Sequence, residues 1–241
     1  KELKQKHSIP NDLSIPCLLG EDLQNNPVWI DLGTHPHTLI AGCSGSGKSV
    51  LLKNIINNLL TQDFIKIYLV DPKQVEFSQF QEYKDKVCCV VSENEGIIDL
   101  LDHLIKMMEQ RYSLMASLGI NSWKDRKTLF NKTVVVIDEI ADLFLNSKNG
   151  KIIKELVLKL AQKARAAGIF LIAATQRPSA DIIDGNIKAN FPARLACKTA
   201  SAIDSRIVLD KKGAELLLGK GDCLIQSSEH EMKRFQVAFV E

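Results

Sequence analysis

The chain has 241 residues, of which 45% are hydrophobic and 25% are charged, and this composition is ordinary for a globular protein. That length suits one large α/β domain or two small domains. The formal net charge of +2 and the pI near 8.2 exclude a uniformly basic nucleic-acid binder, although both values are compatible with a locally basic surface.

Apolar runs and helical patterns alternate along the chain. The runs predict strands at 26–32, 37–42, 65–71, 87–91, 133–139, 169–175, 193–198, 221–225 and 234–239. Apolar residues at helical spacing predict helices at 49–60, 93–118 and 151–167, with helical turns at 203–209 and 214–217. Continuous apolar strands separated by helices indicate an α/β fold with a mostly parallel sheet that helices cover on both faces. In this architecture ligands bind beyond the carboxyl ends of the strands.

The first ten residues are charged and polar, so we expect no signal peptide in this segment. No uninterrupted apolar run approaches the roughly 20 residues that a membrane-spanning helix needs. We therefore expect a soluble, cytoplasmic chain. The sequence begins without Met and ends abruptly, so we expect it to be cut from a longer one.

The cysteines form no CxxC pair and no Cys/His cluster, and four of them lie in apolar runs. We therefore expect reduced, buried cysteines rather than disulfides or metal ligands. The six are Cys17, Cys43, Cys88, Cys89, Cys197 and Cys223.

The segment between the strand predicted at 37–42 and the helix predicted at 49–60 reads GCSGSGKS. It fits the phosphate-loop pattern G-x-x-x-x-G-K-[ST] in full. Glycines let the backbone wrap closely around phosphate oxygens, and the next helix presents its positive N-terminus. We expect Lys48 to reach the β- and γ-phosphates of ATP and Ser49 to bind Mg²⁺. The predicted nucleotide-binding residues are Gly42, Cys43, Ser44, Gly45, Ser46, Gly47, Lys48 and Ser49.

The segment VVVIDEIADLF carries two carboxylates to the end of the strand predicted at 133–139. We expect Asp138 to hold Mg²⁺, directly or through a water, on the side opposite Ser49. Glu139 is positioned to polarise a water towards the γ-phosphate as a general base. A protein that only binds nucleotide needs no such base, so this pair favours ATP hydrolysis.

Several sequence blocks between residues 18 and 240 together resemble those of a known family. These blocks, in order, are HPHTLIAGCSGSGKSVLLK, LVDPKQVEF, MEQRYSLMASLGI, VVVIDEIADLF, LAQKARAAGIFLIAATQRPSADIIDGNIKANFPARLA, AIDSRIVLD and GAELLLGKGDCLI. Together they resemble the motor domain of the FtsK/SpoIIIE double-stranded DNA translocases. We accordingly divide the chain into a strand-rich N-terminal segment at 1–36 and an ATPase motor domain at 37–241.

The resemblance implies a RecA-like P-loop NTPase fold and a Mg²⁺-dependent ATPase that works as a homo-hexameric ring. Such rings pump double-stranded DNA through a central channel in chromosome segregation, sporulation or conjugative transfer. Two alternatives stay open. One is an FtsK-like ATPase that moves a polypeptide in a protein secretion system, and the other is an ATP-dependent assembly module that does not hydrolyse ATP.

In such a ring one subunit can supply an arginine to the ATP of its neighbour, because each nucleotide lies between subunits. Arg165 is the first candidate, followed by Arg194 and Arg206; the alternative for Arg165 is a cation that stabilises a helix C-terminus. Gln176 follows the strand predicted at 169–175 and is expected to sense the γ-phosphate or to orient the water. Its alternative is a simple polar strand end.

For the DNA, the segment RPSADIIDGNIKANFPAR offers Arg177, Lys188 and Arg194 as contacts to backbone phosphates. Longer members of the family add a winged-helix domain that reads orienting DNA sequences and an anchor in the inner membrane. Neither occurs within these 241 residues. Either they lie elsewhere in a longer chain, or the protein belongs to a mobile-element or conjugative branch without them. Asp71 and Lys73 end another strand near the nucleotide edge, and they are interpreted either as structural or as supports of the residues that contact the nucleotide.

Overall fold

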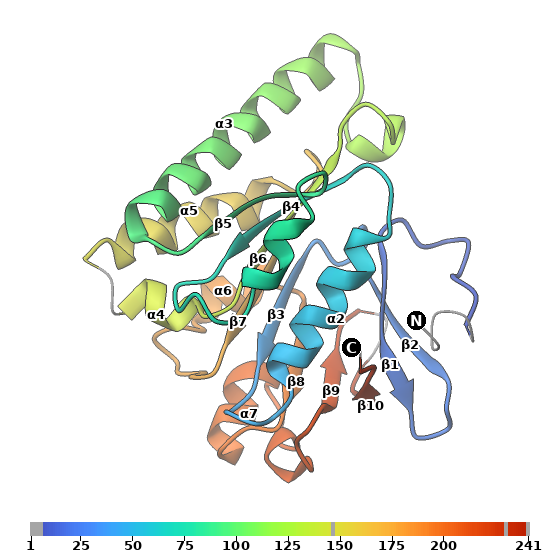
Figure 1. Cartoon of the computed structure of the whole chain (residues 1–241), viewed down its shortest axis with the longest axis vertical. Helices are drawn as coiled ribbons and strands as arrows, with labels where there is room; N and C mark the ends of the chain where they lie inside the picture. Colours follow the sequence, from blue (N-terminus) through green and yellow to red (C-terminus); the bar gives the residue numbers. More distant parts are fainter. Residues whose placement is uncertain (1–6, 146–147, 229–230, 240–241) are drawn as a thin grey trace. The chain divides into compact units, whose positions relative to one another are not determined.

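The computed structural model describes residues 7–145, 148–228 and 231–239 (Figure 1). The chain divides into two compact units. The first unit contains Lys1–Gln62 and Ala173–Glu241, and the second contains Asp63–Ile172. The chain thus leaves the first unit after Gln62 and returns to it within a single strand. Residues 1–6 of the predicted N-terminal segment lie outside the described residues, and the division predicted after residue 36 stays a prediction.

The first unit is built on a sheet in which parallel and antiparallel strands meet. In spatial order its strands are β2 (Pro27–Asp31), β1 (Pro16–Asp22), β10 (Lys233–Val237), β9 (Asp222–Gln226), β8 (Ala193–Cys197) and β3 (His37–Ala41). β3 and β8 run parallel, with Thr38 opposite Ala193 and Ala41 opposite Ala196. The other neighbouring pairs are antiparallel. The last residues of β7 (Ile169–Thr175) also belong to this unit.

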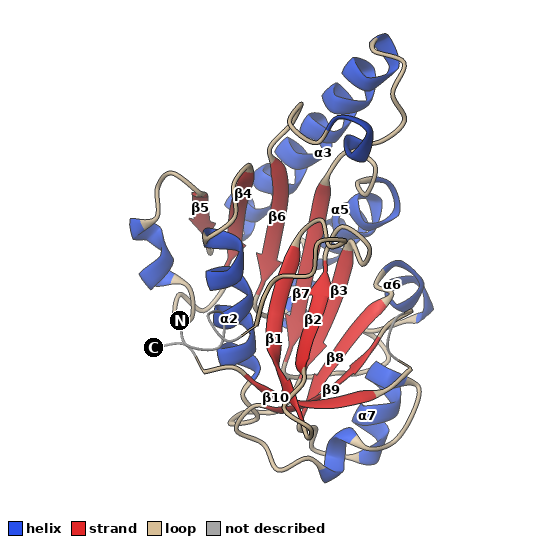
Figure 2. Ribbon diagram, turned by 90° about the vertical axis from the view of Figure 1, so that its right-hand side faces the viewer, coloured by secondary structure: helices blue, strands red, loops and turns tan. Residues whose placement is uncertain are grey.

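Helices cover both faces of this sheet. Figure 2 shows α2 (Lys48–Leu60) on one side, and α6 (Gly185–Asn190) and α7 (Ala202–Leu209) on the other. α2 packs against β1 through two buried amides: Asn54 Nδ2 donates to Leu18 O at 2.7 Å, and Asn58 Oδ1 accepts from Leu18 N at 3.2 Å. These bonds satisfy polar groups that would otherwise be costly to bury. A short 3₁₀ helix, Ala214–Leu216, follows α7.

The second unit has a parallel sheet. Its strands are β6 (Lys132–Ile137), β4 (Ile65–Val70) and β5 (Val87–Val91), with β4 paired to both of the others, and the first residues of β7. The helices α3 (Asn94–Ser117) and α5 (Gly150–Lys163) lie side by side in Figure 1 and pack together. The shorter elements are α4 (Ile140–Leu145) and the 3₁₀ helices Ser78–Glu82 and Trp123–Arg126.

The predicted α/β class is confirmed, and the antiparallel strands β1, β2, β9 and β10 extend the sheet beyond its parallel part. The predictions missed β1 and α4. The helix predicted over 151–167 was too long, since α5 ends at Lys163 and a turn follows. In this turn Gly168 N donates to Arg165 O at 3.1 Å and Ile169 N donates to Ala164 O at 3.1 Å, while Gly168 has φ +71°. This is the bonding of a Schellman motif, which ends helices at a left-handed glycine.

All six cysteines are free in the structure, and Cys17, Cys197 and Cys223 are buried. The expectation of burial was wrong for Cys88, which is exposed. Its strand, β5, has a neighbour on one side only among the strands of the second unit, so fewer side chains cover it. Within the described ranges, none of the helices combines the length and the hydropathy that crossing a lipid bilayer requires.

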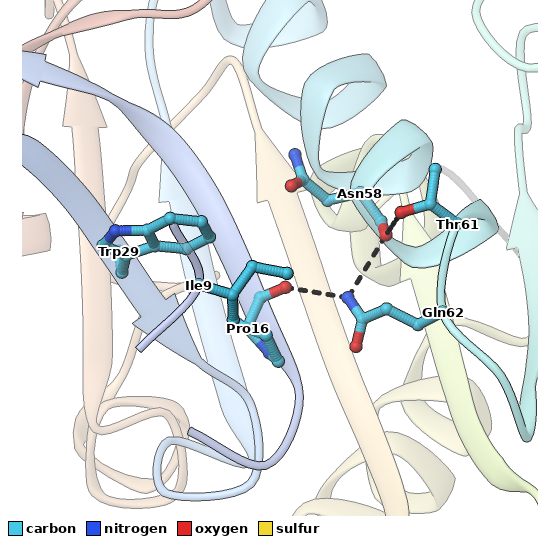
Figure 3. Close-up of a pocket in the computed structure, with 6 residues that line it drawn as sticks. All are labelled: Ile9, Pro16, Trp29, Asn58, Thr61 and Gln62. Atoms are coloured by element: carbon cyan, nitrogen blue, oxygen red, sulfur yellow. Dashed lines mark hydrogen bonds between the residues drawn. The ribbon is translucent and has the colours of Figure 1, made fainter. Parts of the chain in front are cut away.

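A small pocket of about 50 Å³ lies between the first two strands and the C-terminal end of α2 (Figure 3). Gln62 Nε2 donates to Pro16 O at 2.8 Å across it, and Trp29 lines its other side. None of its six lining residues is ionisable: they are Ile9, Pro16, Trp29, Asn58, Thr61 and Gln62. It lies at the opposite end of α2 from the phosphate loop, about 20 Å away for a helix of this length.

Candidate functional site

The phosphate loop connects β3 to α2, so the predicted order of strand, glycine-rich loop and helix is confirmed. Its first two amides are tied to neighbouring strands. Gly42 N donates to Thr175 O at 3.2 Å, and Cys43 N donates to Lys198 O at 2.8 Å. The loop therefore starts between the C-terminal ends of β7 and β8, at the edge of the sheet where ligands of α/β proteins bind.

Two glycines set the shape of this loop. Gly45 and Gly47 have φ values of +74° and +100°, a backbone region that residues with a Cβ rarely adopt. A Cβ on Gly47 would also lie 2.3 Å from the backbone nitrogen of Gly221 and 2.6 Å from its Cα. A substitution at Gly47 would therefore strain the backbone and displace a second segment of the chain.

The turn of the loop offers N–H groups to an anion. Among the described residues, none accepts a hydrogen bond from the N–H groups of Ser44, Gly45 or Gly47. α2 follows directly, and the positive end of its dipole adds to the potential at the loop. Lys48 opens the helix with only 3% of its surface exposed. These features together are those of a phosphate-binding loop.

In the second unit, Asp138 and Glu139 fill the gap between β6 and α4. Both are 2% exposed, and Asp138 N donates to Val70 O at 3.1 Å, which continues the pairing of β6 with β4. The Lys73 ammonium lies 3.0 Å from Asp142 Oδ2. This hydrogen bond raises the pKa of Lys73, and the negative charges of Asp142, Glu139 and Asp138 raise it further. Lys73 is therefore a cation held beside a group of carboxylates.

Asp71, at the end of β4, stabilises a turn. Its Oδ2 accepts the N–H groups of Glu76 and Phe77, both at 2.9 Å, and its side chain is fully buried. These bonds fit the structural interpretation of Asp71.

Arg165 lies in the turn that follows α5, and it is exposed. No carboxylate in the part of the chain that the structure describes lies within ion-pair distance of its guanidinium. A cation in this condition can bind an anion of another molecule. Its position near a helix C-terminus equally fits the stabilising role described for such cations.

Gln176 and Arg177 come directly after β7 in the first unit. The carbonyl of the preceding residue, Thr175, accepts the N–H of Gly42, and Arg177 N donates to Thr175 Oγ1 at 3.0 Å. Gln176 therefore lies one residue beyond the hydrogen bond that joins β7 to the phosphate loop. Arg177 is exposed.

The other two predicted DNA contacts share one carboxylate. Lys188 Nζ lies 2.6 Å from Asp210 Oδ1, and Arg194 pairs with Asp210 Oδ2. Burial acts to raise the pKa of Asp210, but the hydrogen bonds from Lys188 and Arg194 outweigh it and hold this pKa below its usual value. This acidic partner was not predicted from the sequence. Its only local signal was an acidic residue at the C-terminal end of a predicted helix.

The phosphate loop, Gln176 and Arg177 thus belong to the first unit, as do Lys188, Arg194 and the exposed Arg206. The second unit holds Asp138, Glu139 and Arg165. Another segment missed by the sequence analysis, Gly219–Gly221, contacts the phosphate loop directly.

The fold and the loop define an α/β protein of the P-loop ATPase class. A profile of the FtsK/SpoIIIE family matches residues 2–134 and 125–180, which together exceed half of the chain. The chain belongs to the FtsK/SpoIIIE family.

Individual relatives agree with this assignment. The DNA translocase FtsK of Chlorobaculum tepidum is 39% identical over 250 residues, which cover 95% of this chain and 31% of that protein. The structure of the pCW3 conjugation coupling protein TcpA, a monomer form with ATPγS, has a TM-score of 0.85 at 30% identity and covers 97% of this chain and 71% of that one. The cytoplasmic domain of the type VII secretion ATPase EccC from Thermomonospora curvata has a TM-score of 0.83 at 24% identity, with 97% and 30% covered, so it supports the fold alone. This chain spans about a third of the length of the FtsK protein.

Proposed function

We propose that this chain is the motor module of an ATP-driven translocase of double-stranded DNA. The observation that carries the proposal is a complete phosphate loop between β3 and α2 in a chain of the FtsK/SpoIIIE family. The relative from C. tepidum is named a DNA translocase, and the conjugation coupling protein TcpA was solved with ATPγS. The first relative supports DNA as the substrate, and the second supports ATP as the nucleotide.

The loop amides and Lys48 would bind the phosphates of ATP, and Ser49 with Asp138 would bind Mg²⁺. Mg²⁺ prefers oxygen ligands and usually keeps several waters, so one protein carboxylate, a hydroxyl and the nucleotide phosphates suit it. The bound ion would neutralise charge on the phosphates.

Glu139 would accept a proton from the attacking water, and Gln176 would orient that water or sense the γ-phosphate. A buried carboxylate directly after a strand is held in place by its neighbours, as a general base requires. Arg165 would contact the ATP of a neighbouring subunit in a homo-hexameric ring. Its exposure and its lack of a carboxylate partner among the described residues are compatible with this role.

The DNA would be held through its phosphates, because a translocase must move along any sequence. Arg177 is the strongest of the three predicted contacts, since it is exposed. Lys188 and Arg194 share the charge of Asp210, so their net attraction for DNA is weaker.

The test is ATP hydrolysis by the purified chain with and without linear duplex DNA, measured together with the size of the assembled particle. We expect hydrolysis that duplex DNA stimulates and that Lys48→Ala abolishes. An assembled particle whose hydrolysis ignores DNA would contradict DNA translocation. Stimulation by a polypeptide instead would support the alternative of a secretion motor.

A further inference from the structure

The segment Gly219–Gly221 is an unusual turn that contacts the phosphate loop. Its three consecutive residues all have left-handed backbones, with φ values of +84°, +53° and +91°. The middle residue, Lys220, has a Cβ, so it holds this conformation at a cost in energy. Strain of this kind persists only where the surrounding structure enforces it.

The turn is bonded to the phosphate loop through two backbone amides. Lys220 N donates to Gly45 O at 3.3 Å, and Gly221 N donates to Ser46 O at 2.8 Å. The approach is so close that Gly47 has no room for a Cβ beside Gly221. Two successive carbonyls of the loop are therefore held by the turn.

The opposite side of the turn is held by the hairpin of β9 and β10. Gln236 Nε2 donates to Lys220 O at 2.9 Å, and Val237 N donates to Gly221 O at 2.8 Å. Asp222, at the start of β9, accepts Leu218 N at 2.8 Å and two hydrogen bonds from Arg234 at 2.8 and 2.6 Å. The turn is thus fixed between the hairpin and the phosphate loop.

These bonds orient the amides of the loop. In a trans peptide the C=O and N–H groups point in opposite directions. Because Gly45 O and Ser46 O face the turn, the N–H groups of Ser46 and Gly47 must point away from it. Ser46 N donates to Cys43 O at 3.1 Å, within the loop, while the N–H of Gly47 has no acceptor among the described residues.

We propose that Gly219–Gly221 is a positioning element for the phosphate loop: it holds two loop carbonyls so that the Gly47 N–H faces the bound phosphates. The inference rests on the nucleotide-binding site proposed above and adds residues to it that touch no phosphate themselves. It also makes the β9–β10 hairpin part of the support of that site.

Substitutions at Lys220 test the backbone requirement, because its side chain is exposed. Gly and Asn tolerate a left-handed backbone, whereas a β-branched residue does not. We expect Lys220→Val to raise the Kd for a fluorescent ATP analogue by about tenfold. Lys220→Gly and Lys220→Asn should stay within about twofold of the original chain.

The matched control is Asn25→Val. Asn25 is also exposed, lies in the same unit and has φ +60°, but it belongs to the turn between β1 and β2. Its substitution should lower the melting temperature without changing the Kd for the analogue. If Lys220→Val does not fold, Gln236→Ala provides a milder test. It removes the hydrogen bond to Lys220 O, and we expect about a threefold rise in Kd.

The outcomes separate the two proposals. If the unmodified chain does not bind the analogue, or if Lys48→Ala binds it equally well, the nucleotide site itself is wrong. If the unmodified chain binds and Lys220→Val and Gln236→Ala bind with unchanged Kd, only the positioning role is wrong. A loss of affinity in Asn25→Val equal to that in Lys220→Val would also overturn the positioning role, because strain anywhere in the unit would then have the same effect.

Discussion

Glu139 is the side chain whose chemistry can be tested most directly. It is 2% exposed between β6 and α4, so truncation would leave a cavity, whereas glutamine keeps its shape and removes only the basic oxygen. We expect Glu139→Gln to lower kcat for ATP hydrolysis by about 10²- to 10⁴-fold while the Kd for ATP changes little. Steady-state hydrolysis and equilibrium nucleotide binding measure the two quantities.

The control for this variant is Asp142→Asn, which removes a carboxylate from the same segment. Asp142 pairs with Lys73 on a partly exposed surface, so its loss should change turnover by no more than about twofold. Unchanged turnover in Glu139→Gln would remove Glu139 as the general base.

The Asp222–Arg234 pair predicts a pH dependence of stability. The hydrogen bonds from Arg234 lower the pKa of Asp222, and burial opposes them without reversing the direction. A carboxyl group whose folded pKa lies below its unfolded value of 3.8 stabilises the fold above that value, and this contribution disappears as the pH falls through the folded pKa. We expect Asp222→Asn to lose about 1–2 kcal/mol of unfolding free energy at pH 7, a modest amount because water screens the half-exposed Arg234.

The loss should shrink when the pH is lowered below about 4, since the original carboxyl is then increasingly protonated as well. Urea unfolding of both chains at pH 7 and pH 3 measures the difference. An equal loss at both pH values would show that the carboxylate charge contributes nothing to the pair.

At the scale of elements, one buried arginine connects α3 to the strands of the second unit. Arg111 is 8% exposed, and burial lowers its pKa to about 10. Its Nη1 donates to Ala167 O at 2.8 Å, and its Nη2 donates to Asn131 O and Thr133 Oγ1, both at 2.9 Å. The guanidinium thus satisfies buried oxygens just before β7 and around the start of β6.

We expect Arg111→Met to lower the free energy of unfolding by about 2–4 kcal/mol, because methionine keeps the apolar stem but leaves these oxygens without a donor. Arg126→Met is the control: Arg126 is exposed, and its loss should change stability by less than about 0.5 kcal/mol. Chemical denaturation of the two variants gives the comparison, and equal effects would contradict the assigned role of Arg111.

The strands and long helices were predictable because their patterns are local. The apolar run 169–175 and the helical spacing of 49–60 each indicate a buried element without information from other segments. The bounds of β7 and α2 agree closely with these two predictions. β1 was missed because its sequence, PCLLGED, begins with proline and contains a glycine, and it forms only by pairing with β2 and β10. Pairing between segments far apart in the chain leaves no local periodicity to read.

At the scale of the whole molecule, the proposed ring predicts that two inactive variants can restore one another. A Lys48→Ala subunit cannot use its own ATP but still offers Arg165 to its neighbour. An Arg165→Ala subunit keeps its own Lys48 but offers no arginine to its neighbour. An equal mixture should recover up to about a quarter of the original hydrolysis, since about one contact in four then joins complementary subunits. Hydrolysis by mixed and unmixed assemblies measures this recovery.

The matched control mixes Lys48→Ala with Glu139→Gln. Both changes are proposed to affect a subunit's own ATP, so no pairing restores a complete site and the mixture should stay inactive. Normal hydrolysis by assembled Arg165→Ala alone would exclude Arg165 as the residue shared between subunits.

The phosphate loop and the two carboxylates after a strand could be predicted without a structure, because each depends on residues that are adjacent in the chain. Family membership followed from the order of such local blocks. The folded chain was needed to show that Gly219–Gly221 holds the loop carbonyls, and that Asp210 shares its charge with Lys188 and Arg194. These contacts join segments that are distant in sequence, and the backbone geometry and charge pairing that define them exist only once the chain has folded.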